Sequence, residues 1–353
     1  GFGVPTSGPL TGFPNGLGAP TLVDQDLNGT VDRVYAGDRL GNVFRFDISK
    51  PNPRDWTVTR LFTARYTRNG ANTLQPVLAQ PLVIKHPTET GFLVIFGTGS
   101  YVSRDDARNQ DIQSLYAIWD RGEAAPATAR DSRETRLIRQ TLSNVQDTAS
   151  VPAVTRRVFL DTQAVEYRAD AQSCTSTGCT NAPGVYGWYV DLDLPAAASA
   201  VAGASLSGVS TAPQYPGERA IRRIILRNGA LFTTTVLPAL DEFSCYGTRP
   251  GAILVLSALT GGDVGQPVID FNNDGRIDGG DLTDIGNESF VAGLLMNQTD
   301  LNGQLVDLAT LGGEGDTDFL FVSGGNSTLA YLIESIRDRR VGRLSWRELD
   351  FIP

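Results

Sequence analysis

Histidine, which builds many catalytic and metal sites, occurs once in this 353-residue chain, as His86. A single imidazole excludes any site that needs two histidines, and a serine triad would have to use His86 itself. His86 stands directly before Pro87 and a predicted turn. We therefore interpret it as an ordinary loop residue rather than a catalytic one.

Cysteine is also scarce, with three residues: Cys174, Cys179 and Cys245. A short-loop disulfide between Cys174 and Cys179, with Gly178 in the turn, is the leading interpretation and leaves Cys245 over. In the alternative, Cys245 pairs with one of these two or with a cysteine outside this stretch. The first pairing indicates an oxidising, extracytoplasmic compartment. No second pair completes a zinc site.

Long apolar runs and positive charge are lacking as well. The longest runs, FLVIF and AILVLSAL, fall far short of the roughly 20 residues that span a bilayer, so no membrane span is predicted. The 30 basic and 39 acidic residues give a net charge of -9. This balance argues against a nucleic-acid partner and favours cations. The start at Gly1, without Met or a signal-like segment, leads us to expect part of a longer protein.

Glycine and proline, by contrast, are plentiful, with 38 and 19 residues set between short apolar runs. This composition favours turns and strands, so we predict an all-β fold. A pattern of strand, Gly-centred turn and second strand recurs along the chain, at 34–48, 92–120, 252–264 and 319–335. At roughly 40 to 50 residues per four-stranded blade, the length suits a β-propeller of about seven blades with inserted loops. A pair of β-sandwiches is the alternative.

The domain prediction is one β-propeller domain over 1–353. The repeating pattern weakens at 121–183 and at 195–217, where we expect irregular insertions. The second of these is rich in small residues and is predicted to be an exposed connection between strands, with a recognition loop as the alternative.

Two acidic loops, DQDLNGTVD (24–32) and DFNNDGRID (270–278), carry the clearest chemical signal. Each has oxygen-bearing side chains at positions 1, 3, 5 and 9, glycine at position 6, and a backbone carbonyl available at position 7. This is the ligand spacing of an EF-hand-type Ca²⁺ loop. The predicted ligands are Asp24, Asp26, Asn28, the Thr30 carbonyl and Asp32 in the first loop, and Asp270, Asn272, Asp274, the Arg276 carbonyl and Asp278 in the second.

The loops differ at position 12, where an EF-hand places a bidentate glutamate. Tyr35 occupies that position in the first loop, so Asp32 must be the bidentate ligand there. Asp281 occupies it in the second loop, where it can ligate directly, ligate through water, or cap a short helix. An acidic turn without metal is the alternative for both loops.

With these loops, the chain resembles the C-terminal propeller domain of the PilY family of type IV pilus biogenesis factors and tip-associated adhesins. The resemblance covers nearly the whole chain, and the AGDRLGNVFRFD block together with the closing SWREL is its most specific part. It implies a modified quinoprotein-like β-propeller. The family's calcium loop matches residues 270–278, and its second, more N-terminal site matches residues 24–32.

The resemblance also implies a role in supporting pilus assembly, in opposing retraction when Ca²⁺ is bound, and in adhesion and twitching motility. The implied partners are type IV pilins and minor pilins, with a host or abiotic surface in the adhesive role. The implied location is the pilus tip, the outer-membrane surface or the periplasm. No Arg-Gly-Asp tripeptide occurs in the sequence, so integrin-type binding is unsupported.

The competing function is a quinoprotein dehydrogenase, which also combines a propeller with Ca²⁺. Such enzymes typically use a vicinal Cys-Cys disulfide and a catalytic aspartate beside the metal, and no two cysteines are adjacent here. Both acidic loops also supply nearly all their ligands from one short segment, which leaves little room for a cofactor carboxylate. We therefore expect a non-enzyme whose one cofactor is Ca²⁺, one or two ions.

Overall fold

The computed structural model describes residues 15–68, 71–103, 105–122, 133–147, 154–175, 178–182, 184–192, 209–211, 216–238, 248–270, 274–281, 291–295, 307–312, 317–323 and 328–334. Within these ranges the regular structure is almost entirely β-strand, and the one α-helix is the single turn α1 (Arg133–Arg136). The prediction of an all-β fold is confirmed.

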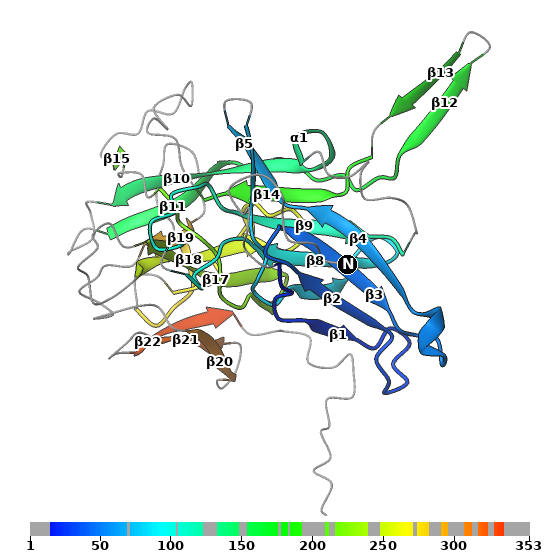
Figure 1. The fold of residues 1–353 in the computed structure, drawn as a ribbon. Helices are drawn as coiled ribbons and strands as arrows, with labels where there is room; N and C mark the ends of the chain where they lie inside the picture. The colour runs from blue at the N-terminus through cyan, green and yellow to red at the C-terminus, as the bar shows by residue number, and fades with distance from the viewer. Residues whose placement is uncertain are drawn as a thin grey trace, which may run out of the picture.

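The first sheet is an antiparallel meander of β1 (Thr21–Val23), β2 (Arg33–Gly37), β3 (Asn42–Asp47) and β4 (Thr57–Thr63), in that order (Figure 1). The alternation in NVFRFD gives β3 two different faces, because successive side chains point to opposite sides of a strand. Arg45 and its cross-strand partner Tyr35 lie on the buried face. The acidic loop 24–32 connects β1 to β2 at one end of this sheet.

A second meander forms the centre of the molecule from β7 (Leu82–Lys85), β8 (Phe92–Gly97), β9 (Ser114–Asp120) and β14 (Gly187–Asp191). The strands β9 and β14 are buried at every residue, and β8 at all but its first. Their continuous apolar and aromatic runs fit strands that are covered on both faces. Trp188 also packs against Gly261, where a Cβ would lie 2.2 Å from the indole ring.

The segment 121–183, predicted to be irregular, is an insertion between β9 and β14 but contains long strands. It includes β10 (Ile138–Asp147), β11 (Val154–Asp161) and the hairpin of β12 (Ala171–Thr175) and β13 (Gly178–Ala182). The start of β10 pairs in parallel with β14, and its later part pairs with β11. The sequence did not predict these strands, because β10 pairs with the distant strand β14 as well as with its neighbour β11, and a distant partner leaves no local pattern.

The strand β11 pairs with β19 (Val291–Leu295), which continues into β18 (Thr248–Ser257), β17 (Ala230–Pro238) and β16 (Ile225–Arg227). Together with β7, β8, β9, β14 and β10, these strands form one 11-stranded sheet, in which β15 (Val209–Thr211) pairs with β10 beside the main path. A separate three-stranded sheet contains β20 (Asp307–Gly312), β21 (Thr317–Ser323) and β22 (Thr328–Glu334). Within 195–217, the structure describes 209–211 and 216–217 alone. The number of blades stays a prediction.

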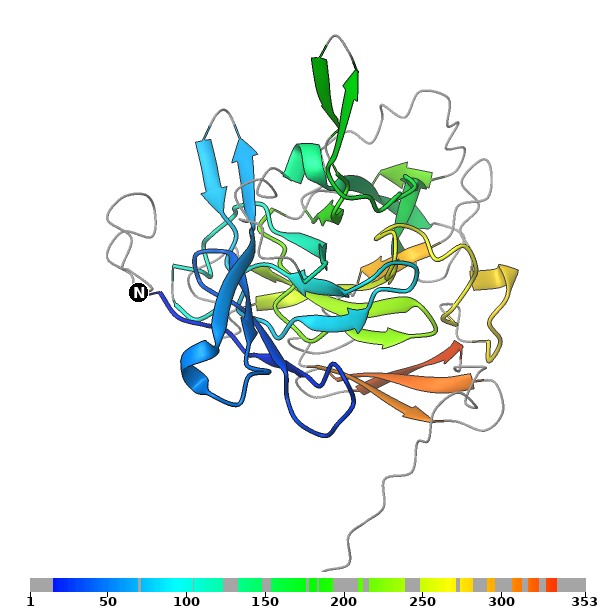
Figure 2. The ribbon, with the colours of Figure 1, turned by 90° about the vertical axis from the view of Figure 1, so that its right-hand side faces the viewer.

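Two hairpins extend from the same side of these sheets. One is β5 (Arg65–Arg68) with β6 (Ala71–Leu74), and the other is β12 with β13 (Figures 1 and 2). Cys174 and Cys179 are direct cross-strand partners in the second hairpin. Opposed antiparallel residues have the Cα spacing that a disulfide requires, so this register suits the predicted pairing. Cys245 lies outside the described residues, and the disulfide stays a prediction.

Buried ion pairs connect these sheets. Arg45 of β3 binds Asp120 of β9 at 2.5 Å, and Tyr35 donates to the same carboxylate at 2.8 Å. Burial and the nearby Asp120 charge raise the pKa of Tyr35. Arg133 of α1 binds both oxygens of Asp191 at 2.9 Å. Burial disfavours the Arg133 charge, but contact with Tyr116 and Asp191 outweighs burial and raises the pKa of Arg133.

His86 lies in the turn after β7 and is buried against Trp119 and Tyr167, with ring centroids 5.4 and 4.4 Å away. Its Nδ1 accepts hydrogen bonds from the N–H groups of Thr88 and Glu89, at 3.3 and 3.0 Å. The residue therefore shapes a turn. Burial lowers the pKa of His86, with a smaller opposing effect from Glu89.

This environment predicts a pH-dependent stability. The unfolded chain binds a proton at His86 near its ordinary pKa of about 6.5, whereas the folded chain resists protonation. The His86 contribution is therefore complete above about pH 6.5 and decreases as the pH falls below that value. Urea unfolding between pH 8 and 5 measures the effect. His86→Asn keeps an acceptor for the turn but does not titrate, so it should flatten the curve in this window. If His86→Asn shows the same pH dependence of unfolding as the wild type, His86 is not the group responsible.

Candidate metal centre

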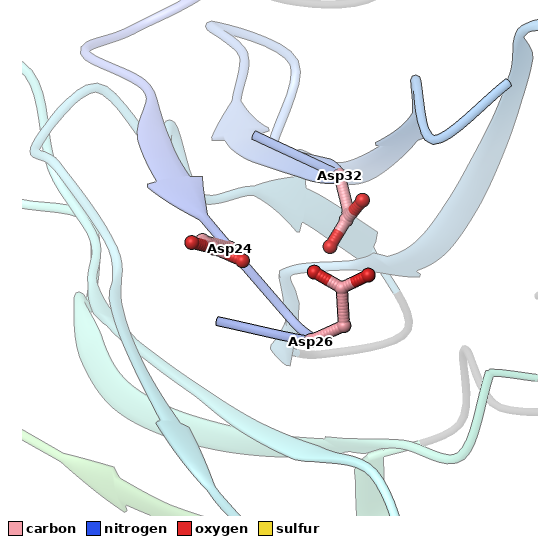
Figure 3. Close-up of side chains that lie close together, drawn as sticks. All are labelled: Asp24, Asp26 and Asp32. Atoms are coloured by element: carbon pink, nitrogen blue, oxygen red, sulfur yellow. The ribbon is translucent and has the colours of Figure 1, made fainter. Parts of the chain in front are cut away.

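The loop after β1 brings three carboxylates together. One oxygen each from Asp24, Asp26 and Asp32 lie within 4.8 Å of one another. Figure 3 shows the carboxylates of Asp26 and Asp32 facing each other, with Asp24 beside them. Three like charges at this spacing repel one another unless a cation lies between them.

Backbone N–H groups orient these carboxylates. Asp24 accepts hydrogen bonds from the N–H of Asn28 at 3.1 Å and of Gly29 at 2.7 Å. Asn28 Oδ1 accepts from the N–H of Thr30 at 2.8 Å, and Asp32 accepts from the N–H of Gln25 at 2.8 Å. The loop thus folds around its own acidic side chains.

The backbone conformation of the loop explains the glycine at position 6. Gly29 has φ +89°, a value that residues with a Cβ adopt at a cost. Leu27 also has a positive φ, 61°, although it is not glycine and its side chain is 87% exposed. The loop therefore keeps its tight curvature, which directs the carboxylates inward, although Leu27 would otherwise prefer a negative φ.

The loop is fixed to the sheet through Asp32. Its N–H donates to the Val23 carbonyl at 3.0 Å, and its carbonyl accepts from the N–H of Ile48 at 2.8 Å. Tyr35, at position 12, points into the core toward Asp120 and is not available to the loop. The donor set is therefore made of hard oxygen atoms from residues 24–32, which suits Ca²⁺ and does not suit a soft metal.

The second loop has the same hydrogen-bond pattern at the same positions. The N–H groups of Asp274 and Gly275 donate to the two oxygens of Asp270, at 3.2 and 2.9 Å. The N–H of Arg276 donates to Asp274 at 2.9 Å, and Gly275 has φ +85°. Asn272 lies outside the described residues. Two segments far apart in the chain thus share one local conformation, as their common spacing predicts.

The structure shows how Asp281 is used in this conformation. Gly280 N–H donates to Asp278 at 2.7 Å, and Asp278 N–H donates back to Asp281 at 3.0 Å. This is a reciprocal capping box on the 3₁₀ turn η4 (Gly279–Asp281). Of the three roles left open for Asp281, capping is the one these contacts show.

The two loops differ in how completely their carboxylates converge. In the part of the chain that the structure describes, Asp24, Asp26 and Asp32 form the group with metal-ligand spacing, and the carboxylates of the second loop do not form one. Asp270 is buried at 1% exposure, whereas Asp274 and Asp278 are exposed. The first loop is therefore the more preorganised of the two.

Together, the sheets and the acidic loops define a large all-β domain with EF-hand-like turns between strands. Comparison with known proteins specifies the family. Residues 6–155 match the model of the PilY1 beta-propeller domain. A solved structure, the C-terminal domain of Pseudomonas aeruginosa PilY1, superposes with a TM-score of 0.65 at 26% identity, and the match covers 91% of this chain and 61% of that one.

Curated relatives agree with this match. The chain is 30% identical over 290 residues to the type IV pilus biogenesis factor PilY1 of Pseudomonas aeruginosa PAO1, covering 76% of this chain and 22% of the relative. It is 30% identical over 261 residues to a PilY1 homolog of Xylella fastidiosa, covering 74% of this chain and 17% of the relative. The chain thus spans less than a quarter of the length of these two proteins. It belongs to the PilY1 β-propeller family, which confirms the resemblance and the propeller fold.

The names of these relatives describe pilus biogenesis factors, in line with the expectation of a non-enzyme. Among the described residues, no helix is long and apolar enough to cross a membrane.

Proposed function

We propose that this chain is a calcium-binding propeller domain that acts in type IV pilus biogenesis. The observation that carries the calcium part is the loop conformation that 24–32 and 270–278 share. In both loops the N–H groups of positions 5 and 6 donate to the aspartate at position 1, and the N–H of position 7 donates to the side chain at position 5. Family membership supports the pilus part. The partners are pilins and minor pilins, and the location is extracytoplasmic, at the pilus tip, the outer-membrane surface or the periplasm.

Calcium would act on this domain through the connections of its loops. In the first loop, Asp32 is a proposed ligand, and its backbone also bonds Val23 of β1 and Ile48, the residue directly after β3. Occupancy would therefore stiffen one end of the first sheet as well as neutralise its carboxylates. An ion changes behaviour only through a difference in affinity between two states, so we propose that the pilus-extending state binds Ca²⁺ more tightly than the retracting state.

Opposing retraction would make calcium a regulator of twitching motility and of surface adhesion. The second loop suits regulation because Asp274 and Asp278 are exposed. A loop whose carboxylates have not fully converged binds with lower affinity than a preorganised one, since ordering it costs free energy. The second loop would then respond to changing calcium while the first remains filled.

The test uses two opposite charge changes at one position in the full-length protein. Asp278→Ala empties the second site, and Asp278→Lys imitates permanent occupancy with a fixed positive charge. We expect Asp278→Ala to lose surface pili through retraction, and Asp278→Lys to keep pili but impair twitching. Pilus counts and twitching-zone diameters measure this.

Asp55→Ala is the matched control, because Asp55 is an exposed acidic residue on the connection between β3 and β4, outside both loops. It should behave as the wild type. Identical piliation and twitching in both Asp278 variants would overturn the calcium switch.

A further inference from the structure

The hairpin of β12 and β13 projects from the other described elements as a two-stranded arm (Figures 1 and 2). Within the described residues, these two strands pair with each other and with no third strand. A two-stranded hairpin on its own is marginally stable at best in water, because it has no packed face to hold it. The arm therefore needs a further contact to stay formed.

Polar contacts fix the base of the arm. The backbones of Arg168 and Val185 exchange two hydrogen bonds, at 3.2 and 2.9 Å. Asp170 accepts a hydrogen bond from the N–H of Gly184 at 2.7 Å and also forms an ion pair with Arg136. These contacts end at the residue before β12, so they fix where the arm begins and leave its outer part to its own strands.

The two strand sequences offer the arm little apolar support. The strand β12 reads AQSCT and β13 reads GCTNA, so besides the cysteines they contain alanine, glycine and polar residues. Neither sequence has a valine, an isoleucine, a leucine or an aromatic residue, and the apolar cross-strand pairs that stabilise many hairpins are therefore lacking. A bond between the two cysteines is the strongest cross-link that these sequences permit.

The register of the arm places the cysteines at a favourable position for that bond. Cys174 is the direct cross-strand partner of Cys179, and the pair beside the turn is Thr175 with Gly178. Because two residues form the connection, the pair beside the turn is hydrogen-bonded and the next pair is not. In a non-hydrogen-bonded pair the Cα atoms are about 4.5 Å apart, which lies within the Cα range of a disulfide, about 4.4–6.8 Å.

A bond at this position acts on the arm and not on the sheets of the body. The main hydrophobic cluster of the described residues contains no residue of β12 or β13, and neither strand belongs to a larger sheet. The entropic effect of a cross-link also grows with the length of the loop that it closes, and this loop has four residues between the cysteines. Breaking the bond should therefore open the arm alone.

We propose that Cys174 and Cys179 form a redox latch, which holds the arm as a hairpin when oxidised and releases it when reduced. In the reducing direction a dithiol attacks the Cys174–Cys179 bond, which breaks to give two thiols, while the dithiol becomes a disulfide. A disulfide-carrying oxidoreductase reverses the exchange. Because the arm extends from the same side as the β5–β6 hairpin, its release changes the surface that this side presents to a partner. The latch does not depend on Ca²⁺ or on the pilus role.

The test compares hydrogen–deuterium exchange of the oxidised protein with that of the protein in dithiothreitol. We expect the amides of 171–182 to be protected in the oxidised protein and to exchange about tenfold faster or more after reduction. The β5–β6 hairpin is the internal control, because it extends from the same side and has no cysteine, so its exchange should not change. The melting temperature should stay within about 2 °C.

The double variant Cys174→Ser/Cys179→Ser should exchange in 171–182 as the reduced wild type does, with or without dithiothreitol. The matched control Cys245→Ser should keep the response of the wild type. Equal exchange of the arm before and after reduction overturns the proposal, and so does a Cys245→Ser variant that no longer responds, since Cys245 then takes part in the bond. Faster exchange of β5–β6 on reduction also overturns it, because the bond then supports more than the arm.

Discussion

Asp191→Ala is expected to reduce the free energy of unfolding by about 3–5 kcal/mol, because it leaves the buried Arg133 charge without its carboxylate. The Arg133 side chain is 3% exposed and that of Asp191 is 6% exposed, and they are joined by two hydrogen bonds of 2.9 Å. The guanidinium also donates to the hydroxyl groups of Tyr116 and Ser114, at 2.7 and 3.2 Å. These groups are neutral, so without Asp191 the Arg133 charge has no compensating carboxylate among these partners. Chemical denaturation at neutral pH measures the effect.

The double variant Arg133→Met/Asp191→Leu separates the pair from its surroundings. Replacing both partners of a buried ion pair with apolar residues is often neutral, so this variant should be more stable than Asp191→Ala. If Asp191→Ala costs less than about 1 kcal/mol, the pair is not buried as the structure shows it.

Calcium is expected to raise the melting temperature without being needed for folding. An ion at one hundred times its Kd stabilises the folded state by about 2.7 kcal/mol per site. The core of β8, β9 and β14 is built from strands outside both loops, so we expect it to form without the ion. EDTA should therefore lower the melting temperature and leave the β-sheet circular dichroism intact. Complete loss of that signal in EDTA at room temperature would contradict a core that is independent of metal.

Matched variants assign the calcium effect to the loops. Asp32→Ala and Asp278→Ala should each remove part of the calcium-dependent rise, and the combination should remove all of it. Asp55→Ala, outside both loops, should keep the full rise.

The acidic loops were predictable from sequence because their geometry is local. The spacing placed an aspartate at position 1 and a glycine at position 6 of each loop. In the structure, the N–H of that glycine donates to that aspartate in both loops, from Gly29 to Asp24 and from Gly275 to Asp270. The convergence of the three carboxylates in the first loop was not predictable in the same way. It depends on the anchoring of Asp32 between β1 and the residue after β3, which local spacing does not contain.

Long-range contacts explain what the sequence could not indicate. The pair Arg133–Asp191 joins residues 58 positions apart, and Arg219 contacts Ser100 across 119 positions. Neither contact has a periodic pattern or a motif in the sequence that would indicate it. The parallel pairing of β10 with β14 was missed for the same reason, since local hairpin patterns predict antiparallel neighbours.

The most direct measurement is calorimetric titration of the calcium-free protein with Ca²⁺. If both loops bind as proposed, the wild type takes up two ions, Asp32→Ala and Asp278→Ala take up one each, and the double variant takes up none. Equal uptake in the wild type and the double variant, or no uptake by the wild type, would contradict the assignment of calcium to these loops.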